Sequence, residues 1–331
     1  MSNASSGDFL TAVRTRLDAA PESALLLPTL FLLLLMILIF SFTADQFLSL
    51  SVLRNVLTQT SIYIILGVGL TIVLTSGEID ISIGSIIGLG AMILGISVVN
   101  LGFPIGIGLL ATLLVGVLCG LMNGFLTAVV RVPSIIVTLG ALTFFRGLAY
   151  LLGGGTVMIG FPPFLVWIGS GTFIGVPVPV WLALIAVIFG QLFLKSTRTG
   201  QHIIAVGGNA EAARLAGINI RFSKILAFVI MGALAAVASI IMVARLDAAQ
   251  SVMGAGIELQ VLAAVVLGGT SLFGGRGVIL GSVLGALILS ILQTGLLLSG
   301  VVQFWQLVAV GALLIAVVAL RISYEPSEVQ S

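Results

Sequence analysis

Residues Thr75 to Ala91 have the sequence TSGEIDISIGSIIGLGA, a polar and glycine-rich stretch in an otherwise apolar chain. Its two carboxylates, Glu78 and Asp80, stand between apolar runs at 54–75 and 84–100. Each run has about the length that an α-helix needs to cross the hydrocarbon core of a bilayer, roughly 20 residues. The stretch therefore predicts a break between two membrane-spanning helices.

Composition supports the same fold class along the whole chain. Hydrophobic residues make up 60% of the 331 residues, charged residues make up only 7%, and the mean hydropathy is +1.32. A soluble domain carries about 25% charged residues. We therefore predict an all-α polytopic membrane protein with about ten transmembrane helices, at 24–42, 54–75, 84–100, 104–128, 133–153, 177–194, 223–245, 258–269, 277–299 and 302–320.

Two regions are predicted to hold short or broken helices, at 76–84 and 258–277. They resemble each other, because at an offset of 193 residues both place a polar, glycine-rich break before a glycine-studded helix. Glycines spaced by four are frequent in membrane helices, so this match leaves an internal duplication open. We take five glycines of these regions as candidate hinge or packing positions: Gly77, Gly84, Gly88, Gly277 and Gly281.

The distribution of Lys and Arg predicts the orientation in the membrane, because cytoplasmic loops carry an excess of both. We expect cytoplasmic tails at 1–23 and 321–331, a transmembrane domain at 24–320, and a cytoplasmic loop at 195–224 within it. With ten spans, ten of the thirteen basic residues then lie on the side of the two termini: Arg14, Arg16, Arg131, Lys195, Arg198, Arg214, Arg221, Lys224, Arg276 and Arg321.

What the sequence lacks limits the classes of function. The net charge of +2 gives no reason to expect a nucleic-acid partner. The chain has no G-x-x-x-x-G-K-[ST] motif, so it does not bind ATP in the P-loop manner. Its single histidine, His202, and its single cysteine, Cys119, argue against a metal site rich in either residue. We expect no catalytic residues, no metal and no cofactor in this chain, and no enzyme activity of its own.

The loop at 195–224 is the only long polar insertion. Asn209 is placed to cap a short helix at 210–216, and Gly217 suits the position after its C-terminus. An acidic residue in the first turn and a basic residue near the end both favour this helix. The loop is either a solvated connection or a docking helix for a cytoplasmic partner.

Four motifs, in order along the chain, resemble one transporter family. They are GEIDISIGSIIGLGA, NGFLTAVVRVPSIIVTLGALTFFRGLAYLLGGG, VGGNAEAARLAGINI and GIELQVLAAVVLGGTSLFGGRGVILGSVLGALIL. With the pattern of spans, the similarity extends from about residue 28 to residue 320. The chain resembles the permease subunit of bacterial ATP-binding-cassette importers for monosaccharides, in the ribose, xylose and galactose branch of the branched-chain amino acid and sugar permease family.

The resemblance implies a fold like that of the type II importers and a multi-pass location in the bacterial inner membrane. It implies three kinds of protein partner: a second permease subunit, in a homo- or heterodimer, a cytoplasmic ATPase that binds ATP and Mg²⁺, and a periplasmic sugar-binding protein. The function it implies is inward transport of a monosaccharide by alternating access. By the match in the loop, the residues that couple to the ATPase are Glu211, Ala212, Ala213, Arg214, Leu215 and Gly217.

Four polar side chains are candidates for the translocation pathway: Glu78, Asp80, Asn123 and Arg146. Each also has a structural interpretation. The two carboxylates can cap the next helix at its N-terminus, and we favour this role over contact with a sugar. Asn123 can bind a hydroxyl or join two helices. Arg146 is expensive near the middle of a span, so it faces a cavity or a partner, or else snorkels to the outer face.

Three alternatives remain open from the sequence. A secondary sugar transporter would use Glu78 or Asp80 as a proton or cation site, and would work without the loop at 195–224. An importer of the same fold could carry another small solute, such as an autoinducer-type sugar, a nucleoside or a branched-chain amino acid. A membrane-embedded enzyme is disfavoured by the missing motifs.

Overall fold

The structure of the chain, a computed structural model, describes residues 22–324. The predicted tails therefore lie largely outside the described residues, as do Arg14 and Arg16. The long helices are α2 (Glu22–Thr43), α3 (Leu50–Thr75), α4 (Ile83–Gly95) continued by the π-helix η1 (Ile96–Asn100), α5 (Ile105–Ala128), α6 (Ser134–Gly153), α8 (Val178–Ser196), α11 (Ile220–Leu246), α13 (Ile279–Leu298) and α14 (Gln303–Tyr324).

The remaining elements are short. Four short helices are α7 (Pro163–Ser170), α9 (Arg198–Gly208), α10 (Ala210–Leu215) and α12 (Ile257–Leu267). The strands β1 (Met158–Ile159) and β4 (Ala248–Ala249) form one antiparallel pair, and β2 (Thr172–Phe173) and β3 (Val176–Pro177) form another. The chain is thus predominantly helical, with very little sheet, where it is described.

The predicted all-α polytopic fold is confirmed. Within residues 22–324, eight helices are long and apolar enough to cross a membrane, and α12 and the apolar part of α14 are shorter apolar helices. Each of the ten predicted spans corresponds to one of these helices. The short helix expected near 258 is α12, which has 11 residues.

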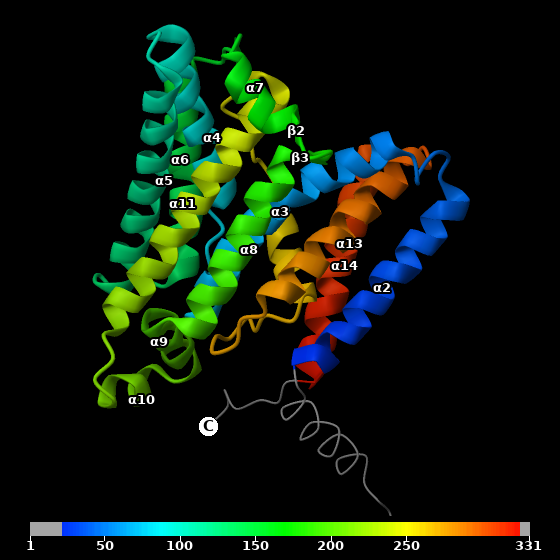
Figure 1. Cartoon of the computed structure of the whole chain (residues 1–331). Coiled ribbons are helices and arrows are strands. Elements are labelled where there is room, and N and C mark those ends of the chain that lie inside the picture. The colour runs from blue at the N-terminus through cyan, green and yellow to red at the C-terminus, as the bar shows by residue number, and fades with distance from the viewer. Residues whose placement is uncertain (1–21, 325–331) are drawn as a thin grey trace, which may run out of the picture.

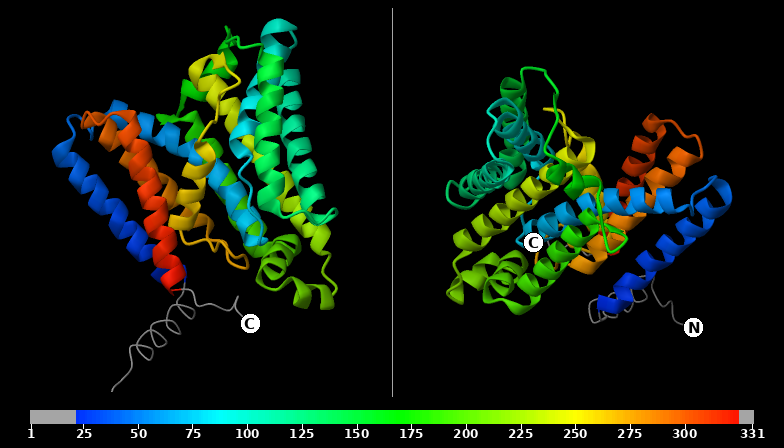
Figure 2. Two further views of the ribbon diagram at one scale, coloured as in Figure 1. Left: turned by 180° about the vertical axis from the view of Figure 1, so that it is seen from behind. Right: turned by 45° about the horizontal axis from the view of Figure 1, so that its top comes forward.

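The long helices run between two ends of the molecule (Figure 1), and successive ones point in opposite directions except α11 and α13, between which the short helix α12 carries the chain back. One end carries α9 and α10, and we call it the peg end; α7, β2 and β3 lie at the other, the α7 end. The beginning of α2 and the end of α14 both lie at the peg end, and the view from behind agrees (Figure 2).

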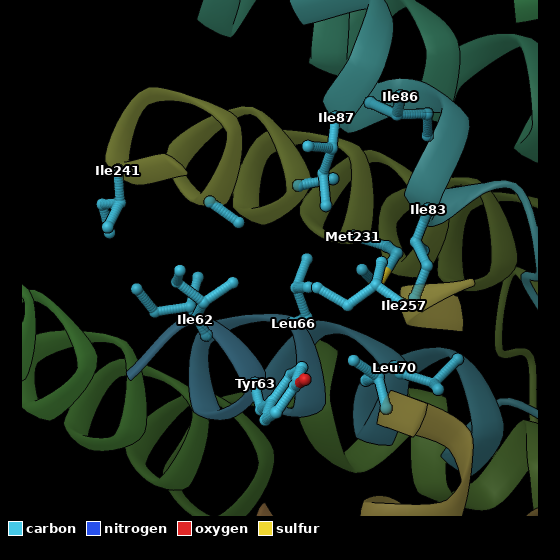
Figure 3. Packing of buried hydrophobic residues seen from close by; sticks show 14 of the residues in the cluster. Ile62, Tyr63, Leu66, Leu70, Ile83, Ile86, Ile87, Met231, Ile241 and Ile257 are labelled. Atoms are coloured by element: carbon cyan, nitrogen blue, oxygen red, sulfur yellow. The ribbon is translucent and has the colours of Figure 1, made fainter. Parts of the chain in front are cut away.

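Helix α3 is the centre of the packing. From Thr58 onward most of its residues are buried, and it contacts α8, α11, α12 and α13. Figure 3 shows Leu66 and Leu70 of α3 opposite Ile83 of α4 and Met231 of α11. Lipid tails are as apolar as these side chains, so close packing, rather than escape from water, holds such helices together.

Small residues bring α5 and α11 into backbone contact. A Cβ on Gly120 would lie 2.2 Å from the carbonyl oxygen of Phe228, and a Cβ on Gly232 would lie 2.1 Å from that of Gly116. Neither position has space for a larger residue. The excess of glycine in this chain is used, at least here, for close approach between helices.

Two helix breaks lie at the peg end. Residues 76–82 separate α3 from α4, and residues 268–278 separate α12 from α13, which confirms the two predicted regions of broken helix. The breaks touch each other, because a Cβ on Gly274 would lie 2.8 Å from the Cα of Gly77. Gly77 has a φ of +80°, a left-handed conformation that favours glycine.

Helix α9 was not expected from the sequence, which predicted one short helix in the loop at 195–224. The structure has two helices there, α9 and α10. Ile203 and Val206 of α9 are buried, three residues apart on one face. The sequence gives little sign of this helical spacing of apolar residues, because the helix is short and contains three glycines, Gly200, Gly207 and Gly208.

We predict that Gly120→Ala destabilises the protein and that Gly140→Ala does not. The added methyl group at 120 meets the Phe228 carbonyl, whereas a Cβ on Gly140 has no neighbour within 4 Å. Overpacking of this kind costs about 1–3 kcal/mol. Thermal unfolding of the two purified variants in detergent measures the difference; equal midpoints would contradict the packing described here.

Candidate functional site

The peg consists of α9 and α10, and polar side chains cap both helices. The Oγ1 of Thr197 accepts a hydrogen bond from Gly200 N at 3.0 Å, and the Oδ1 of Asn209 accepts one from Ala212 N at 2.9 Å. Gly217, just after α10, has a φ of +82°. The caps predicted at Asn209 and Gly217 are thus confirmed as structure; their role in coupling stays a prediction.

Of the six residues predicted to couple to an ATPase, five are exposed. Ala213 is the exception, with only 5% of its surface exposed, so it packs inward and offers no contact to a partner. Leu215 is 77% exposed, an unusual position for a leucine on a polar peg. Arg214 donates from Nε to Glu211 Oε2 at 3.0 Å. This hydrogen bond lowers the pKa of Glu211 and raises that of Arg214, so both are charged at neutral pH.

The inner side of α9 touches both helix breaks. A Cβ on Gly207 would lie 1.8 Å from the carbonyl oxygen of Thr75 and 2.6 Å from the amide nitrogen of Gly275. That amide donates to the Thr75 carbonyl at 3.0 Å, which joins the end of α3 to the second break. We call Gly77, Gly207, Gly274 and Gly275, with Thr75, the glycine junction. It places the peg in direct contact with both interruptions.

Glu78 lies in the first break and forms an ion pair with Lys224 of α11. Only 11% of the Glu78 side chain and 22% of the Lys224 side chain are exposed. The prediction that Glu78 caps α4 is therefore wrong, because its carboxylate is engaged by α11 instead. The pair ties the break to the helix that follows the peg.

Asp80 lies in the first break, three residues before α4, and is 1% exposed. Its Oδ1 accepts hydrogen bonds from Ser82 N at 2.8 Å and from Ser82 Oγ at 2.7 Å. Asp80 thus holds the residue that precedes α4 and bonds to none of the first amides of that helix, so the predicted cap is not formed. Asn123 of α5 donates from Nδ2 to the same Ser82 Oγ at 2.8 Å, so it joins two segments. Within the described residues, Asp80 Oδ2 and Asn123 Oδ1 have no hydrogen-bond partner. Burial raises the pKa of the Asp80 carboxyl.

Arg146 of α6 is half-buried, and its guanidinium is bound by backbone carbonyl oxygens. Its Nη1 donates to the carbonyl oxygens of Ser251, at 2.6 Å, and Met253, at 2.9 Å. Its Nη2 donates to the carbonyl oxygen of Gly84 at 2.9 Å. One guanidinium has five N–H donors, so it can satisfy several carbonyls at once. Arg146 thus clamps α6 to α4 and to the non-helical segment before α12.

The other predicted hinge glycines all lie at close contacts. A Cβ added to Gly84 would lie 2.2 Å from the carbonyl oxygen of Gly254, and a Cβ added to Gly88 would lie 2.6 Å from Arg146 Nη1. A Cβ added to Gly277 would lie 2.1 Å from Thr75 Oγ1, and a Cβ added to Gly281 would lie 1.7 Å from the carbonyl oxygen of Gly268. These contacts show a packing role, whereas a role as hinges stays a prediction.

A groove of about 690 Å³ lies beside the peg at this end. It is bounded by the turn between α5 and α6, the loop after α10 and the start of α11. Its charged lining residues are mostly basic: Glu78, Arg131, Arg214, Arg221 and Lys224. The groove adjoins α10, because Arg214 is part of its lining.

A second polar feature was missed from the sequence. A cavity of about 370 Å³ lies between α3, α12, α13 and α14, with Gln59, Tyr63, Gln260, Gln293 and Gln306 in its lining. Tyr63 OH donates to Gln260 Oε1 at 2.7 Å, and Gln59 Nε2 donates to Gln293 Oε1 at 3.0 Å. The only local signal was the spacing of Gln59 and Tyr63, four residues apart on one face of α3. We call these five residues with Thr294 the amide pocket.

We predict that Lys224→Met destabilises the protein more than the double change Glu78→Gln with Lys224→Met. The single change leaves a nearly buried carboxylate without its partner, at a cost of about 1–3 kcal/mol, whereas the double change removes both charges. A double-mutant cycle on thermal stability measures the coupling. Additive effects of the two single changes would show that the pair contributes nothing.

Comparison with known proteins identifies the family. Residues 52–318 match the family model of the branched-chain amino acid transport system permease component. The ribose import permease protein RbsC of Escherichia coli K12 is 40% identical over 284 residues, covering 85% of this chain and 88% of that protein. RbsC of Haemophilus influenzae is 37% identical over 296 residues, covering 88% and 91%.

A second group of relatives has a different printed role. The autoinducer 2 import system permease protein LsrC of Escherichia coli O157:H7 is 36% identical over 284 residues, covering 86% of this chain and 83% of that protein. No solved structure gives a significant match. With its apolar helices and these relatives, the chain is a multi-pass protein of the inner membrane, and it belongs to the family of branched-chain amino acid and sugar permease components of ATP-binding-cassette importers.

Proposed function

We propose that this chain is the membrane-spanning subunit of an ATP-driven importer that moves a monosaccharide into the cell by alternating access. The names of the relatives, ribose import permease and autoinducer 2 import system permease, support a small sugar-like solute. The branched-chain amino acid in the family's description is the second candidate. The chain supplies the passage and the contact to its partners, and no covalent chemistry.

The peg end is proposed to face the cytoplasm. Between α5 and α13, the segments at this end contain seven basic residues: Arg131, Lys195, Arg198, Arg214, Arg221, Lys224 and Arg276. An excess of Lys and Arg is typical of cytoplasmic loops. Both termini, which continue from helix ends at the peg end, are then cytoplasmic as well.

The single observation that carries the proposal is the exposed Leu215 at the end of the capped helix α10, which packs on α9, the helix that touches both breaks. A side chain 77% exposed is available to a partner protein, and its burial in an interface would remove apolar surface from water, which favours association. We propose that α10 and the adjacent basic groove seat in a cytoplasmic ATPase, which binds the ATP and Mg²⁺.

The glycine junction supports a route for the movement. Rotation or translation of the peg acts on the end of α3 and on the segment 268–278, since α9 contacts both through backbone atoms. A movement of these breaks shifts α4 and α13, which begin directly after them. Two further proteins complete the proposed importer: a second permease subunit, and a periplasmic binding protein that docks on the α7 end.

The test of the proposed function is uptake by the reconstituted importer. The chain, its ATPase and its binding protein are placed in liposomes, and uptake of radiolabelled D-ribose, D-xylose and D-galactose is measured. We expect uptake that requires ATP and is unaffected by a protonophore. Uptake driven by a proton gradient without ATP or the ATPase would contradict the proposal.

We predict that Leu215→Asp weakens association with the ATPase about tenfold or more, because it places a charge at an apolar contact. Val252→Asp is the matched control: Val252 is also an exposed apolar residue, but it lies between β4 and α12, away from the peg. Co-purification and binding assays with the ATPase compare the two. Equal association for both variants would remove Leu215 from the coupling surface.

A further inference from the structure

The amide pocket is lined by neutral hydrogen-bonding groups from four helices. Its polar side chains come from Gln59 and Tyr63 of α3, Gln260 of α12, Gln293 and Thr294 of α13 and Gln306 of α14. The other lining residues, Leu297 and Leu307, are apolar, so no charged side chain lines the cavity. Arg245 of α11 is not part of the lining.

The pocket retains unused hydrogen-bonding capacity. Tyr63 OH is shared between the Oε1 atoms of Gln260, at 2.7 Å, and Gln293, at 3.1 Å. The Nε2 atoms of these two glutamines and the Oε1 of Gln59 make no hydrogen bond within residues 22–324. Two amide NH2 groups, with two N–H donors each, and one amide oxygen therefore remain for a molecule in the cavity. Its volume of about 370 Å³ lies within the range of roughly 300–1,000 Å³ that small-molecule sites have.

The pocket is connected to the peg by the helices that line it. Tyr63 is twelve residues from the end of α3 at Thr75, or about 18 Å along the helix. Gln260 stands on α12, which ends at the second break, and α13 begins after that break. A ligand that draws α3, α12 and α13 together would therefore act on the two breaks at their ends, which are the same breaks that α9 contacts.

We propose that the amide pocket binds the transported solute during passage, and that this solute is a neutral polyhydroxyl molecule, a monosaccharide. The inference rests on the proposed function and selects among its candidates. Hydroxyl groups match the free amide donors and acceptor. An amino acid would bring a carboxylate and an ammonium group into a cavity whose lining offers no charge to either, which is expensive in an apolar surrounding.

Protection from a thiol reagent tests occupancy directly. In a Cys119→Ala background, Gln293→Cys places a thiol in the pocket, and its reaction with N-ethylmaleimide is timed in the reconstituted importer. We expect D-ribose or D-galactose to slow the reaction several-fold and L-leucine to leave it unchanged. Asn55→Cys is the control, because Asn55 is exposed on the same helix as Gln59 and lies outside the pocket; its reaction should not respond to sugar.

Uptake by variants gives the second measurement. Gln260→Leu and Gln293→Leu should each lower kcat/KM for sugar uptake about fivefold or more, as expected for one lost hydrogen bond, with ATPase association unchanged. Asn55→Leu should retain wild-type uptake. Two results together would overturn the inference: sugar does not slow the labelling of the Gln293→Cys variant, and neither leucine variant alters uptake. If the wild-type importer still takes up sugar in that case, the proposed function stands. Protection by L-leucine would overturn the assignment of a neutral ligand.

Discussion

The structure depends on one constraint: backbone groups at a helix break in an apolar chain must find partners within the protein, because lipid offers none. In the first break, Ile79 N donates to Ser134 Oγ at 3.1 Å, so α6 supplies the partner. In the second, Val278 N donates to Thr270 Oγ1 at 3.1 Å. Small polar side chains therefore stand where the helices stop.

The same constraint explains the glycines and Arg146. The breaks, α9 and the neighbouring helices approach to backbone contact, which leaves no space for a Cβ at Gly207 or Gly281. Arg146 donates to the carbonyl oxygens of Ser251 and Met253, which lie outside the helices, and to that of Gly84 in the first turn of α4. A charge that looks expensive from the sequence is, in the fold, the donor that lets a non-helical segment exist inside the bundle.

Much of the fold was predictable because hydropathy alone determines where a chain crosses a membrane. The caps at Asn209 and Gly217 were predictable for a similar reason, since capping is local. The pairing of Glu78 with Lys224, 146 residues apart, and the amide pocket were not, because both arise only when distant helices meet. Helix α9 was missed because only two apolar side chains, Ile203 and Val206, form its buried face, which is too few to show a helical period. The coupling residues followed from a resemblance, and only the structure shows that Ala213 points inward.

The account makes the two breaks the moving parts of the permease, driven from the peg and linked to the solute site by α3 and α12. Hydrogen–deuterium exchange of the reconstituted importer, with and without ATP and vanadate, tests this most directly. We expect exchange in 76–82 and 268–278 to change together on nucleotide trapping, while the glycine-packed contact of α5 with α11 stays protected. Unchanged exchange in both breaks, with changes confined to other segments, would contradict it.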